Sequence, residues 1–338
     1  MRPLLAPEPT APVEPAAVPT FSVIIAAYQV ADLIGEAIES VLAQTAPPLE
    51  IVVCDDGSTD DLDRALAPYR DRLTLLRQPN RGESAAKNTA AAAASGDYVV
   101  ILDADDAWLP ERLEALGELA ATRPDLDILT TDAWFELGGQ KAGRFYSATT
   151  PFAVNEQRTA ILERDFIMPH PAVRRSRWLA IGGFAESVGY AADWDCWIRL
   201  ILDGSLAGIV DQPLAYYRLR EGSLSSRRAE SLRARVTVLE RTKCHPGLRQ
   251  DERPHLARCL AVHRRRALLA EAEAALRAGT AEARRACLRV TFGPGFGLQS
   301  RLRSGIAALA PRAAGRYLEA RERRTGWSRL SRPVPDRP

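Results

Sequence analysis

The sequence predicts an α/β protein in which a mostly parallel sheet is flanked by helices, followed by an all-helical region. Short β-rich apolar runs alternate with segments of helical periodicity from Phe21 onward. This order is typical of a parallel sheet with helices on both faces. Beyond about Ser223, only helical Ala/Arg-rich patterns remain. The 338-residue chain is long enough to bury a large core and to form a second region.

The elements of the sheet region follow one another in a regular order. The first strand is expected in FSVIIAAY, and the helix after it has its apolar residues on one face. A second apolar strand, LEIVVCDDGSTDD, ends in acids, with Ser58 or Thr59 suited to cap the next helix. The remaining elements are the strand LTLLRQ, the Ala-rich helix GESAAKNTAAAAASG, the strand DYVVILDADD, helix 110–122, strand 126–134, the helix DWDCWIRLILDG and the strand GIVDQPLAYYRL.

Charge divides the chain into an acidic part and a basic part. Residues 227–338 contain 26 Lys/Arg against 10 Asp/Glu, whereas residues 1–226 contain 19 against 33. Two regions of opposite charge usually have different tasks. No apolar run reaches the roughly 18 residues that a membrane-spanning helix needs, and the five cysteines are scattered without a CxxC pair. We therefore expect a cytoplasmic protein with free thiols.

Carboxylates gather at the ends of two predicted strands. One strand ends in Asp55 and Asp56, and another in Asp103, Asp105 and Asp106. Ligands bind beyond the carboxyl ends of the strands in such sheets, so the two acidic clusters should converge in one site. Paired acids at this edge can hold a hard divalent cation, Mg²⁺ or Mn²⁺, together with a substrate phosphate. A single acidic strand end would indicate only a turn or a cap.

Six segments in a fixed order resemble the inverting nucleotide-sugar glycosyltransferases of family 2. They are SVIIAAY, VLAQTAPPLEIVVCDDGSTDD, NRGESAAKNTA, GDYVVILDADD, GGF and ADWDCWIRL. Each segment alone is a weak signal, but their order and spacing make the resemblance specific. It covers residues 21–225 and implies the GT-A fold, a Rossmann-like, mostly parallel sheet flanked by helices. The C-terminal helical extension has no comparable motif.

The resemblance implies where the nucleotide would bind. Ala26 and Tyr28 stand where the family's first strand meets the base, and Tyr28 would stack on it. Asp55 and Asp56 match the acids of the family's DDGS segment, one of which hydrogen-bonds the base. Arg81 lies in a segment that usually supplies positive charge near the nucleotide.

The resemblance also implies a metal and diphosphate site. Asp103, Ala104 and Asp105 form the DxD sequence, in which Asp103 would face ribose or metal and Asp105 would bind metal and diphosphate. Lys87 would add positive charge near the nucleotide, with a Lys where Arg is usual. Arg220 follows the last strand at a position where many relatives have His, and it would bind phosphate but could not ligate a metal.

Asp193 matches the family's general base, which deprotonates the acceptor hydroxyl. The acceptor would attack opposite the departing nucleoside diphosphate and invert the anomeric carbon, so one base within hydrogen-bond reach suffices. Ala192 replaces the Glu that usually precedes this Asp. The alternative for Asp193 is a helix N-cap, and Asp195 is expected to be a first-turn acid favoured by the helix dipole. We expect His170 to lie in a proline-bounded turn rather than to face the acceptor.

These patterns predict a metal-dependent, inverting transfer of a sugar from a nucleoside-diphosphate donor to a glycan or lipid-linked acceptor, in bacterial surface polysaccharide synthesis. The alternative is a catalytically silent sugar-nucleotide-binding scaffold of the same fold, which Ala192 favours. Other phosphate enzymes fit poorly. A nucleotidyltransferase would need a Gly-rich basic loop after the first strand, and a phosphatase would need a nucleophilic Asp where this chain has Tyr28.

We expect three regions along the chain. They are a disordered Pro/Ala-rich leader over residues 1–20, a catalytic domain over 21–225 and a basic helical region over 226–338. The arginines of the last region have three interpretations: solvated helix faces, contact with anionic lipid at the inner face of a membrane, or docking onto an acidic domain. Nucleic acid is not an expected partner, because these arginines lack interleaved aromatic residues.

Overall fold

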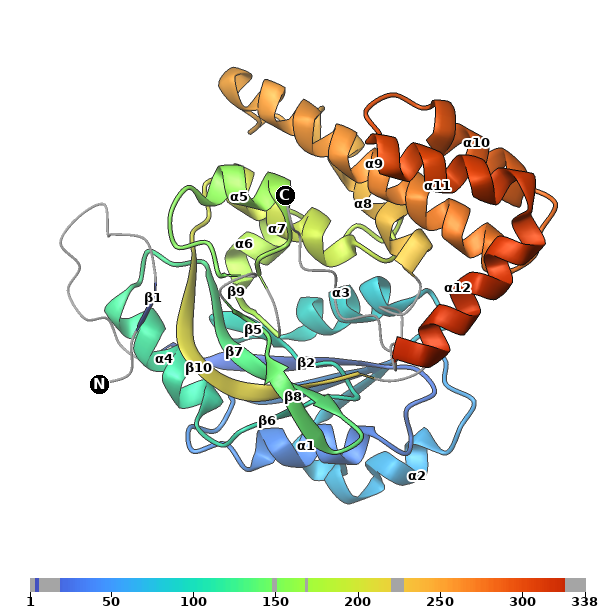
Figure 1. Ribbon diagram of the computed structural model, residues 1–338. Helices are drawn as coiled ribbons and strands as arrows, with labels where there is room; N and C mark the ends of the chain where they lie inside the picture. Colours follow the sequence, from blue (N-terminus) through green and yellow to red (C-terminus); the bar gives the residue numbers. More distant parts are fainter. Residues whose placement is uncertain (1–3, 6–18, 148–150, 168–169, 220–227, 326–338) are drawn as a thin grey trace. The chain divides into compact units, whose positions relative to one another are not determined.

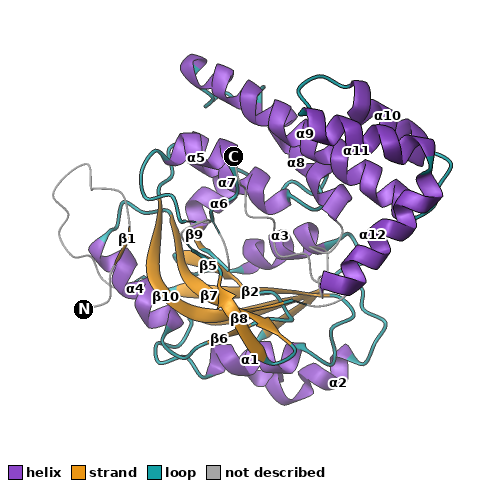
Figure 2. Ribbon diagram, in the orientation of Figure 1, coloured by secondary structure: helices purple, strands orange, loops and turns teal. Residues whose placement is uncertain are grey.

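The computed structural model describes residues 4–5, 19–147, 151–167, 170–219 and 228–325, which fall into two compact units. One unit holds the described residues up to Leu219, and the other holds those from Arg228 onward. The first is mixed α/β and the second is helical (Figures 1 and 2). The fold class predicted from the sequence is therefore confirmed.

The first unit is built around a curved sheet, shown in orange in Figure 2, with ten strands among the described residues. Its order is β1-β10-β7-β9-β5-β2-β3-β4, with β6 against β10 and β8 against β7. The strands are β1 (Leu4–Leu5), β2 (Phe21–Ala27), β3 (Glu50–Asp55), β4 (Thr74–Arg77), β5 (Tyr98–Ile101), β6 (Ala107–Trp108), β7 (Ile128–Leu137), β8 (Gln140–Arg144), β9 (Ala172–Arg174) and β10 (Ala207–Arg218).

Parallel pairing brings the ends of the first strands to one edge of the sheet. Strand β2 pairs in parallel with both β3 and β5, and Ala27 lies opposite Asp55 at its carboxyl end. On the other side, the Leu102 amide donates to the carbonyl of Ile24 as the chain leaves β5. The loops that follow β2, β3 and β5 therefore start at the same edge. This is the edge at which the sequence predicts a site.

An antiparallel strand interrupts the parallel order. Strand β9 pairs with β5 on one side and with β7 on the other, antiparallel to both. The sequence does not reveal it, because a strand of three residues is too short to show a period of two. The insertion has a consequence for the site, since it brings the segment before Ala172 next to the end of β5.

Helices cover both faces of the sheet (Figure 1). They are α1 (Ile34–Leu42), α2 (Leu62–Leu66), α3 (Glu83–Ala93), α4 (Arg112–Thr122), α5 (Gln157–Glu163), α6 (Arg175–Ala180) and α7 (Ala192–Leu202), with a 3-10 helix, η1 (Ala67–Arg72), after α2. Side chains of β2 alternate between the faces, so Val23 and Ile25 join α1 and α4 in one apolar core. Helix α3 contacts β2 and β3 through small alanines, which allow a close approach.

The N-terminal residues and Arg220 differ in how far the structure describes them. The disordered leader expected over residues 1–20 does not hold for Leu4–Leu5, which form β1 and pair with Ile209 and Val210 of β10. Residues 1–3 and 6–18 lie outside the described residues, and so does Arg220, within 220–227.

The second unit consists of helices stacked through small apolar side chains. They are α8 (Arg228–Thr242), α9 (Arg253–Arg277), α10 (Ala283–Phe292), α11 (Leu298–Leu309) and α12 (Pro311–Thr325), with a 3-10 helix, η3 (Gln250–Glu252), before α9. Residues of α9, α10 and α11 share one cluster around Cys287 and Val290, and Leu232 of α8 packs on alanines of α9. Across the described part of the chain, no helix combines the length and apolar character of a transmembrane span.

Candidate active site

The end of β2 presents an aromatic side chain to solvent at the site edge. Tyr28 follows the last residue of β2 and is 49% exposed, whereas Ala27 before it is buried. Gln29 has a φ of 54°, in the left-handed region, and its side-chain amide donates to the hydroxyl of Thr59 at 2.7 Å. This hydrogen bond ties the loop after β2 to the loop after β3. Tyr28 is thus an exposed ring on an anchored loop, with the partly exposed Ala26 close to it on β2.

The two acids after β3 have different environments. Asp56 is buried, and its carboxylate accepts three hydrogen bonds, from the Gln78 side chain at 2.7 Å and from the amides of Arg81 and Gly82 at 2.9 and 2.8 Å. It therefore fixes the loop that carries Arg81. Asp55 is only partly buried, and one of its oxygens accepts from the Ser58 amide at 2.8 Å. Of the pair, Asp55 is the acid with an accessible carboxylate.

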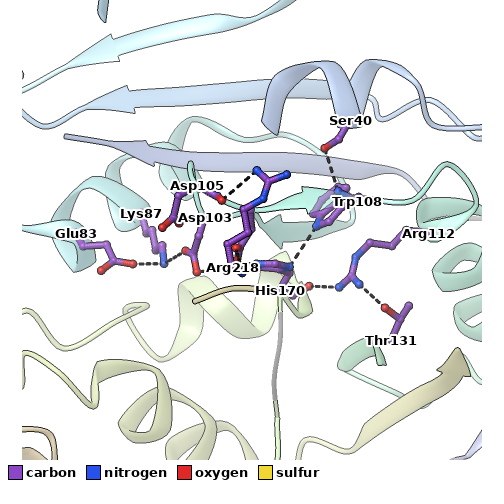
Figure 3. Close-up of polar contacts among 11 residues, drawn as sticks. Ser40, Glu83, Lys87, Asp103, Asp105, Trp108, Arg112, Thr131, His170 and Arg218 are labelled. Atoms are coloured by element: carbon purple, nitrogen blue, oxygen red, sulfur yellow. Dashed lines mark hydrogen bonds and ion pairs between the residues drawn. The ribbon is translucent and has the colours of Figure 1, made fainter. Parts of the chain in front are cut away.

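Lys87 forms a buried ion pair with the first acid of the DxD sequence. Its Nζ lies 2.6 Å from Asp103 Oδ1 and also contacts Glu83 on the same helix (Figure 3). Burial raises the pKa of Asp103, but the charge and hydrogen bond of Lys87, together with a smaller contribution from His170, hold it below its ordinary value. Burial alone would lower the pKa of Lys87, and the charges of Asp103 and Glu83 raise it instead. The first carboxylate is thus kept ionised by the protein itself.

His170 occupies the other side of the acid cluster. Its Nε2 lies 2.7 Å from Asp106 Oδ2 and 4.0 Å from Asp103 Oδ2, and its Nδ1 lies 3.4 Å from Trp108 Nε1 (Figure 3). Because an indole N–H can only donate, Nδ1 is the acceptor and the imidazole hydrogen resides on Nε2, which donates to Asp106. His170 has a φ of 49° and is buried. His170 therefore does more than lie in the turn expected from the sequence, because its ring contacts the acid cluster.

Two arginines, Arg112 and Arg218, fix the positions of His170 and of the DxD loop. Arg112 of α4 is fully buried, donates to the His170 carbonyl at 2.6 Å and contacts the hydroxyl of Thr131. Arg218, at the end of β10, donates its amide to Asp106 Oδ1 at 2.7 Å and its guanidinium to the Asp105 carbonyl at 3.3 Å. Arg218 of β10 therefore holds the DxD loop directly, through the Asp105 carbonyl and the Asp106 side chain, whereas Arg112 of α4 holds the backbone of His170.

Tyr217 at the end of β10 is a buried phenol near the acid cluster. Burial raises the pKa of its hydroxyl, and the charges of Asp106, Asp103, Asp193 and Asp105 raise it further. Three of these acids belong to the loop after β5, and the fourth belongs to α7, far along the sequence. The convergence predicted from the sequence concerns Asp55 and Asp56 with the DxD acids, and their strands β3 and β5 both pair with β2 in parallel.

Asp193 lies in the first turn of α7, which begins at Ala192. The N-cap is Ala191, so the alternative assignment of Asp193 as the cap residue does not apply. Its Oδ1 accepts from the Trp194 amide at 2.7 Å, and its side chain is partly exposed. Asp195, by contrast, is buried and pairs with Arg199 at 2.7 Å, a stronger interaction than the expected helix-dipole contact.

The GGF segment is a fixed loop between α6 and α7. Arg199 donates to the carbonyls of Ile181 and Gly183 at 2.8 and 2.6 Å. The side chain of Asn88, on α3, exchanges two hydrogen bonds with the backbone of Phe184, at 2.8 and 2.9 Å. Gly183 has a φ of 66°, and an added Cβ would lie 2.3 Å from Asn88 Oδ1. The loop thus connects α7, which carries Asp193, to α3, which carries Lys87.

Arg81 lies near this loop as well. Its guanidinium contacts Glu186 at 3.0 Å, in the segment that leads to α7, and its side chain is 55% exposed. The structure therefore brings Tyr28, Asp55, Arg81 and Lys87 to the same edge as the DxD loop. Arg220 cannot be placed, because it lies outside the described residues.

Oxygen donors suitable for a hard cation are present in the acid cluster. Asp103, Asp106 and His170 each offer a ligand atom, and these atoms all lie within 4.8 Å of one another. Asp106 and His170 are buried and bonded to each other, whereas Asp103 and Asp105 are partly exposed. This group consists of two carboxylates and one imidazole nitrogen, which Mn²⁺ or Mg²⁺ can accept, and Asp103 is its partly exposed member. Asp105 lies outside the group and is also partly exposed.

Three parts of the site do not follow from the local sequence patterns. Arg112 lies in the predicted helix 110–122 and Trp108 lies just before it, and they look like ordinary surface and core residues there. Arg218 precedes Arg220 by two residues on the same predicted strand end, so alternation could have suggested both. The partnership of His170 with Asp106 joins residues 64 positions apart, and no local pattern reports it.

The arrangement defines a class of protein before any relative is considered. A mixed sheet covered by helices, with acids at its carboxyl edge, is the architecture of the GT-A fold, and solved structures of that fold match it. Staphylococcus aureus TarS 1-349 with UDP has a TM-score of 0.58 at 20% identity, covering 91% of this chain and 92% of that one. The mannosyltransferase PcManGT of Pyrobaculum calidifontis, with GDP-Man and Mn²⁺, has a TM-score of 0.57 at 21% identity, covering 92% and 91%.

The family follows from the sequence comparisons. The family model for glycosyl transferase family 2 matches residues 22–179. Chondroitin synthase of Escherichia coli is 32% identical over 216 residues, which are 62% of this chain and 30% of that protein. An uncharacterized glycosyltransferase of Nostoc is 42% identical over 112 residues, 32% of this chain and 35% of that protein. These matches support a family 2 glycosyltransferase, and the chain spans about a third of the length of these two relatives.

A relative of more similar length is also known. The E. coli protein WfaP, described as a UDP-Glc:alpha-D-GlcNAc-diphosphoundecaprenol beta-1,3-glucosyltransferase, is 26% identical over 230 residues. The match covers 65% of this chain and 85% of WfaP. The recognition of family 2 from the ordered sequence segments is thus confirmed.

Proposed function

We propose that this chain is an inverting glycosyltransferase that moves a sugar from a nucleoside-diphosphate donor to a hydroxyl of a glycan or lipid-linked acceptor. The observation that carries this proposal is the acid cluster at the carboxyl edge of the sheet, where Lys87 pairs with Asp103 and the side chain of Asp105 is partly exposed. Asp193, partly exposed in the first turn of α7, would supply the proton acceptor. Relatives active in polysaccharide and glycolipid synthesis support bacterial surface polysaccharide as the product class.

The donor nucleotide would bind along the ends of β2 and β3. The exposed ring of Tyr28 would stack on the base, and Asp55 would accept a hydrogen bond from it. Asp56 would act indirectly, because its carboxylate is already bonded to the loop that carries Arg81. Arg81 would exchange Glu186 for a phosphate oxygen, a step that an exposed ion pair permits at low cost. UDP and GDP-Man in the similar solved structures support a nucleoside-diphosphate donor.

The diphosphate would lie over the DxD loop, where Asp103 and Asp105 would hold a divalent metal. Bound there, Mg²⁺ or Mn²⁺ would neutralise the charge that develops on the departing diphosphate. The protein contributes the geometry. Lys87 keeps Asp103 ionised and oriented, while Arg218 fixes the loop through the Asp105 carbonyl. Because Asp106 and His170 are buried and bonded to each other, they support the loop rather than face the donor.

Asp193 would take the proton from the acceptor hydroxyl. Its carboxylate lies in the first turn of α7, where the helix dipole favours negative charge, and the Trp194 amide orients it. Attack from the side opposite the diphosphate inverts the anomeric carbon and needs only this base. The lipid diphosphate acceptor named for WfaP supports a lipid-linked acceptor here. Such an acceptor would be met at the cytoplasmic face of a membrane, and the free state of all five cysteines fits a reducing compartment.

Donor hydrolysis is the experiment that tests this proposal. The full chain is incubated with UDP-, GDP-, dTDP- and CMP-sugars in the presence of Mn²⁺, Mg²⁺ or EDTA, and nucleotide release is followed. We expect slow, metal-dependent release from one donor, lost in Asp105→Ala and kept in Asp71→Ala, an exposed acid of η1. Nucleotide binding without release, even with acceptor extracts, would support the silent scaffold. Absence of binding to every donor would contradict the proposal.

A further inference from the structure

Large apolar side chains are unusually exposed in the helical unit. In α10–α12, Phe292 is 78% exposed, Leu298 73%, Ile306 69%, Leu309 82% and Tyr317 67%. Leu302 and Leu288 are also exposed. Among the described residues of the sheet-bearing unit, the most exposed large apolar side chain is Leu49, at 53%. Contiguous apolar patches on a protein surface usually mark a contact with a partner or a membrane.

On α11 these side chains form one stripe. Leu298, Leu302, Ile306 and Leu309 are spaced by four, four and three residues, so they lie on the same side of the helix. The helix packs into the unit through a different side, where Ala308 is buried in the cluster around Cys287. The stripe is therefore not the packing face of α11. It remains as a second apolar face, turned to the surface.

The loop between α10 and α11 holds the stripe in place. Arg301 donates to the carbonyls of Gly293 and Phe296 at 2.8 and 3.0 Å. The ring of Phe296 is buried inside the unit, whereas Phe292, at the end of α10, points outward. A fixed loop therefore carries exposed apolar residues at both of its ends, Phe292 before it and Leu298 after it.

The charged side chains within α10, the connecting loop and α11 have a single sign, although the exposed Glu282 precedes α10. Residues 283–309 contain five arginines and no Lys, Asp or Glu. Arg284, Arg285, Arg289 and Arg303 are exposed, and Arg301 is partly buried by its loop contacts. Long arginine side chains can lie along an apolar surface while the guanidinium stays in the polar layer. An apolar face bordered only by cations is typical of helices that lie in the interface of an anionic membrane.

We propose that α10, α11 and their connecting loop, Ala283–Leu309, form a membrane-binding surface that recognises anionic lipid. The stripe of α11 and the ring of Phe292 would enter the acyl boundary, and the arginines would contact lipid phosphates. Such a surface would bring the enzyme to a lipid-linked acceptor. This biological role rests on the proposed function, whereas the lipid binding does not. Binding to lipid itself requires no sugar transfer.

Other occupants explain only part of these observations. Solvated helix faces would account for the arginines but not for four exposed aliphatic side chains in a row. An acidic protein domain would likewise pair with the arginines and leave the stripe unexplained. A second copy of this chain would cover the stripe, but a two-fold interface would bring arginine-rich surfaces of like charge together. Anionic lipid matches both the apolar stripe and the charge.

Vesicle flotation with the full chain tests the proposal. Binding is measured on phosphatidylcholine vesicles and on vesicles that also contain phosphatidylglycerol. We expect binding to the anionic vesicles that falls with added salt, and more than about tenfold weaker binding for Leu302→Gln/Ile306→Gln. The control Leu49→Gln/Leu179→Gln removes two exposed leucines of the other unit and should bind like the unchanged chain. For Arg285→Gln/Arg303→Gln we expect a loss of about 30-fold, since each basic residue near the surface contributes about fivefold.

The outcomes separate this surface from the glycosyltransferase proposal. Nucleotide release by the stripe variants should remain unchanged in the absence of lipid, and circular dichroism should show unchanged helix content. No binding to anionic vesicles, or equal binding by all variants, would overturn the membrane surface and leave the active-site proposal intact. A dimer in solution that Leu302→Gln/Ile306→Gln disrupts, without vesicle binding, would assign the stripe to a second copy of the chain and would also overturn the proposal.

Discussion

The two units of this protein place their charged and apolar groups in opposite ways. In the sheet-bearing unit, the ion pair between Lys87 and Asp103 is shielded, and the Lys87 side chain is only 9% exposed. In the helical unit, Arg264 contacts Glu240 on an open surface, with side chains 55% and 36% exposed. Large apolar side chains show the reverse distribution, since they fill the sheet's core and lie outside on α10 and α11.

This difference teaches what each unit can do. A buried charge is costly unless it is paired and hydrogen-bonded, so a network such as Asp103, Lys87, Asp106 and His170 defines one fixed geometry. That geometry suits chemistry on a polar ligand. Exposed arginines and leucines define no such geometry, but they suit a broad surface contact. Variants in one unit should therefore affect transfer, and variants in the other should affect binding to lipid.

The largest effect is expected for Asp193→Asn. Removal of a general base typically costs 10²–10⁴-fold, so we expect turnover to fall by about 10³-fold while nucleotide binding remains. Asp203→Asn, at the opposite end of α7, is the control and should retain full turnover. Transfer is measured with the donor found by hydrolysis and an acceptor extract. Vesicle binding should not change. Unchanged turnover in Asp193→Asn would remove this residue from the mechanism.

A pair of glycine variants tests how firmly the GGF loop is fixed. Gly182 and Gly183 both have positive φ, but only at Gly183 would a Cβ meet neighbours, Asn88 and Trp178, at 2.3 and 2.8 Å. Alanine at a left-handed position costs about 1–2 kcal/mol, and overpacking adds about 1–3 kcal/mol. Gly183→Ala should therefore lower the free energy of unfolding by about 2 kcal/mol more than Gly182→Ala in urea titrations. Equal losses of unfolding free energy in the two variants would show that the Asn88 side chain can move aside at no energetic cost.

Lys87→Met should change the pH dependence of the site. Lys87 lowers the pKa of Asp103, so removing its charge should raise that pKa. Protonated Asp103 cannot contribute its negative charge, so nucleotide release should decline at a higher pH in the variant as the solution is acidified. Lys87→Arg keeps the charge and is the control. If nucleotide release declined at the same acidic pH in Lys87→Met and Lys87→Arg, the role given to the Lys87–Asp103 pair would be contradicted.

The smallest effect is expected for Arg264→Gln in the helical unit. Exposed ion pairs contribute about 0–1 kcal/mol, so this variant should unfold at nearly the same urea concentration as the unchanged chain. Nucleotide release should also be unaffected. A loss above about 2 kcal/mol would show that ion pairs of the helical unit carry more than surface exposure suggests, and it would weaken the contrast between the units.

Much of the sheet and part of the site could be predicted from local patterns. Apolar runs, Ala-rich helical segments and strand-terminal acids are each encoded within about ten residues, and parallel pairing then places Asp55 and Asp103 at one edge. Strand β9 could not be predicted, because three residues carry no period. The bond between His170 and Asp106 was missed for a related reason, since it depends on where β9 inserts into the sheet.

The sequence by itself determined the α/β class, the family and the residue types available for phosphate, metal and proton chemistry. Those properties depend on order and spacing along the chain. Only the tertiary structure decided that Asp56 fixes a loop while Asp55 remains accessible, and that Lys87 pairs with Asp103. It also decided which side of α11 is exposed. Burial and pairing depend on neighbours distant in sequence, because packing, and not local pattern, sets the environment of each side chain.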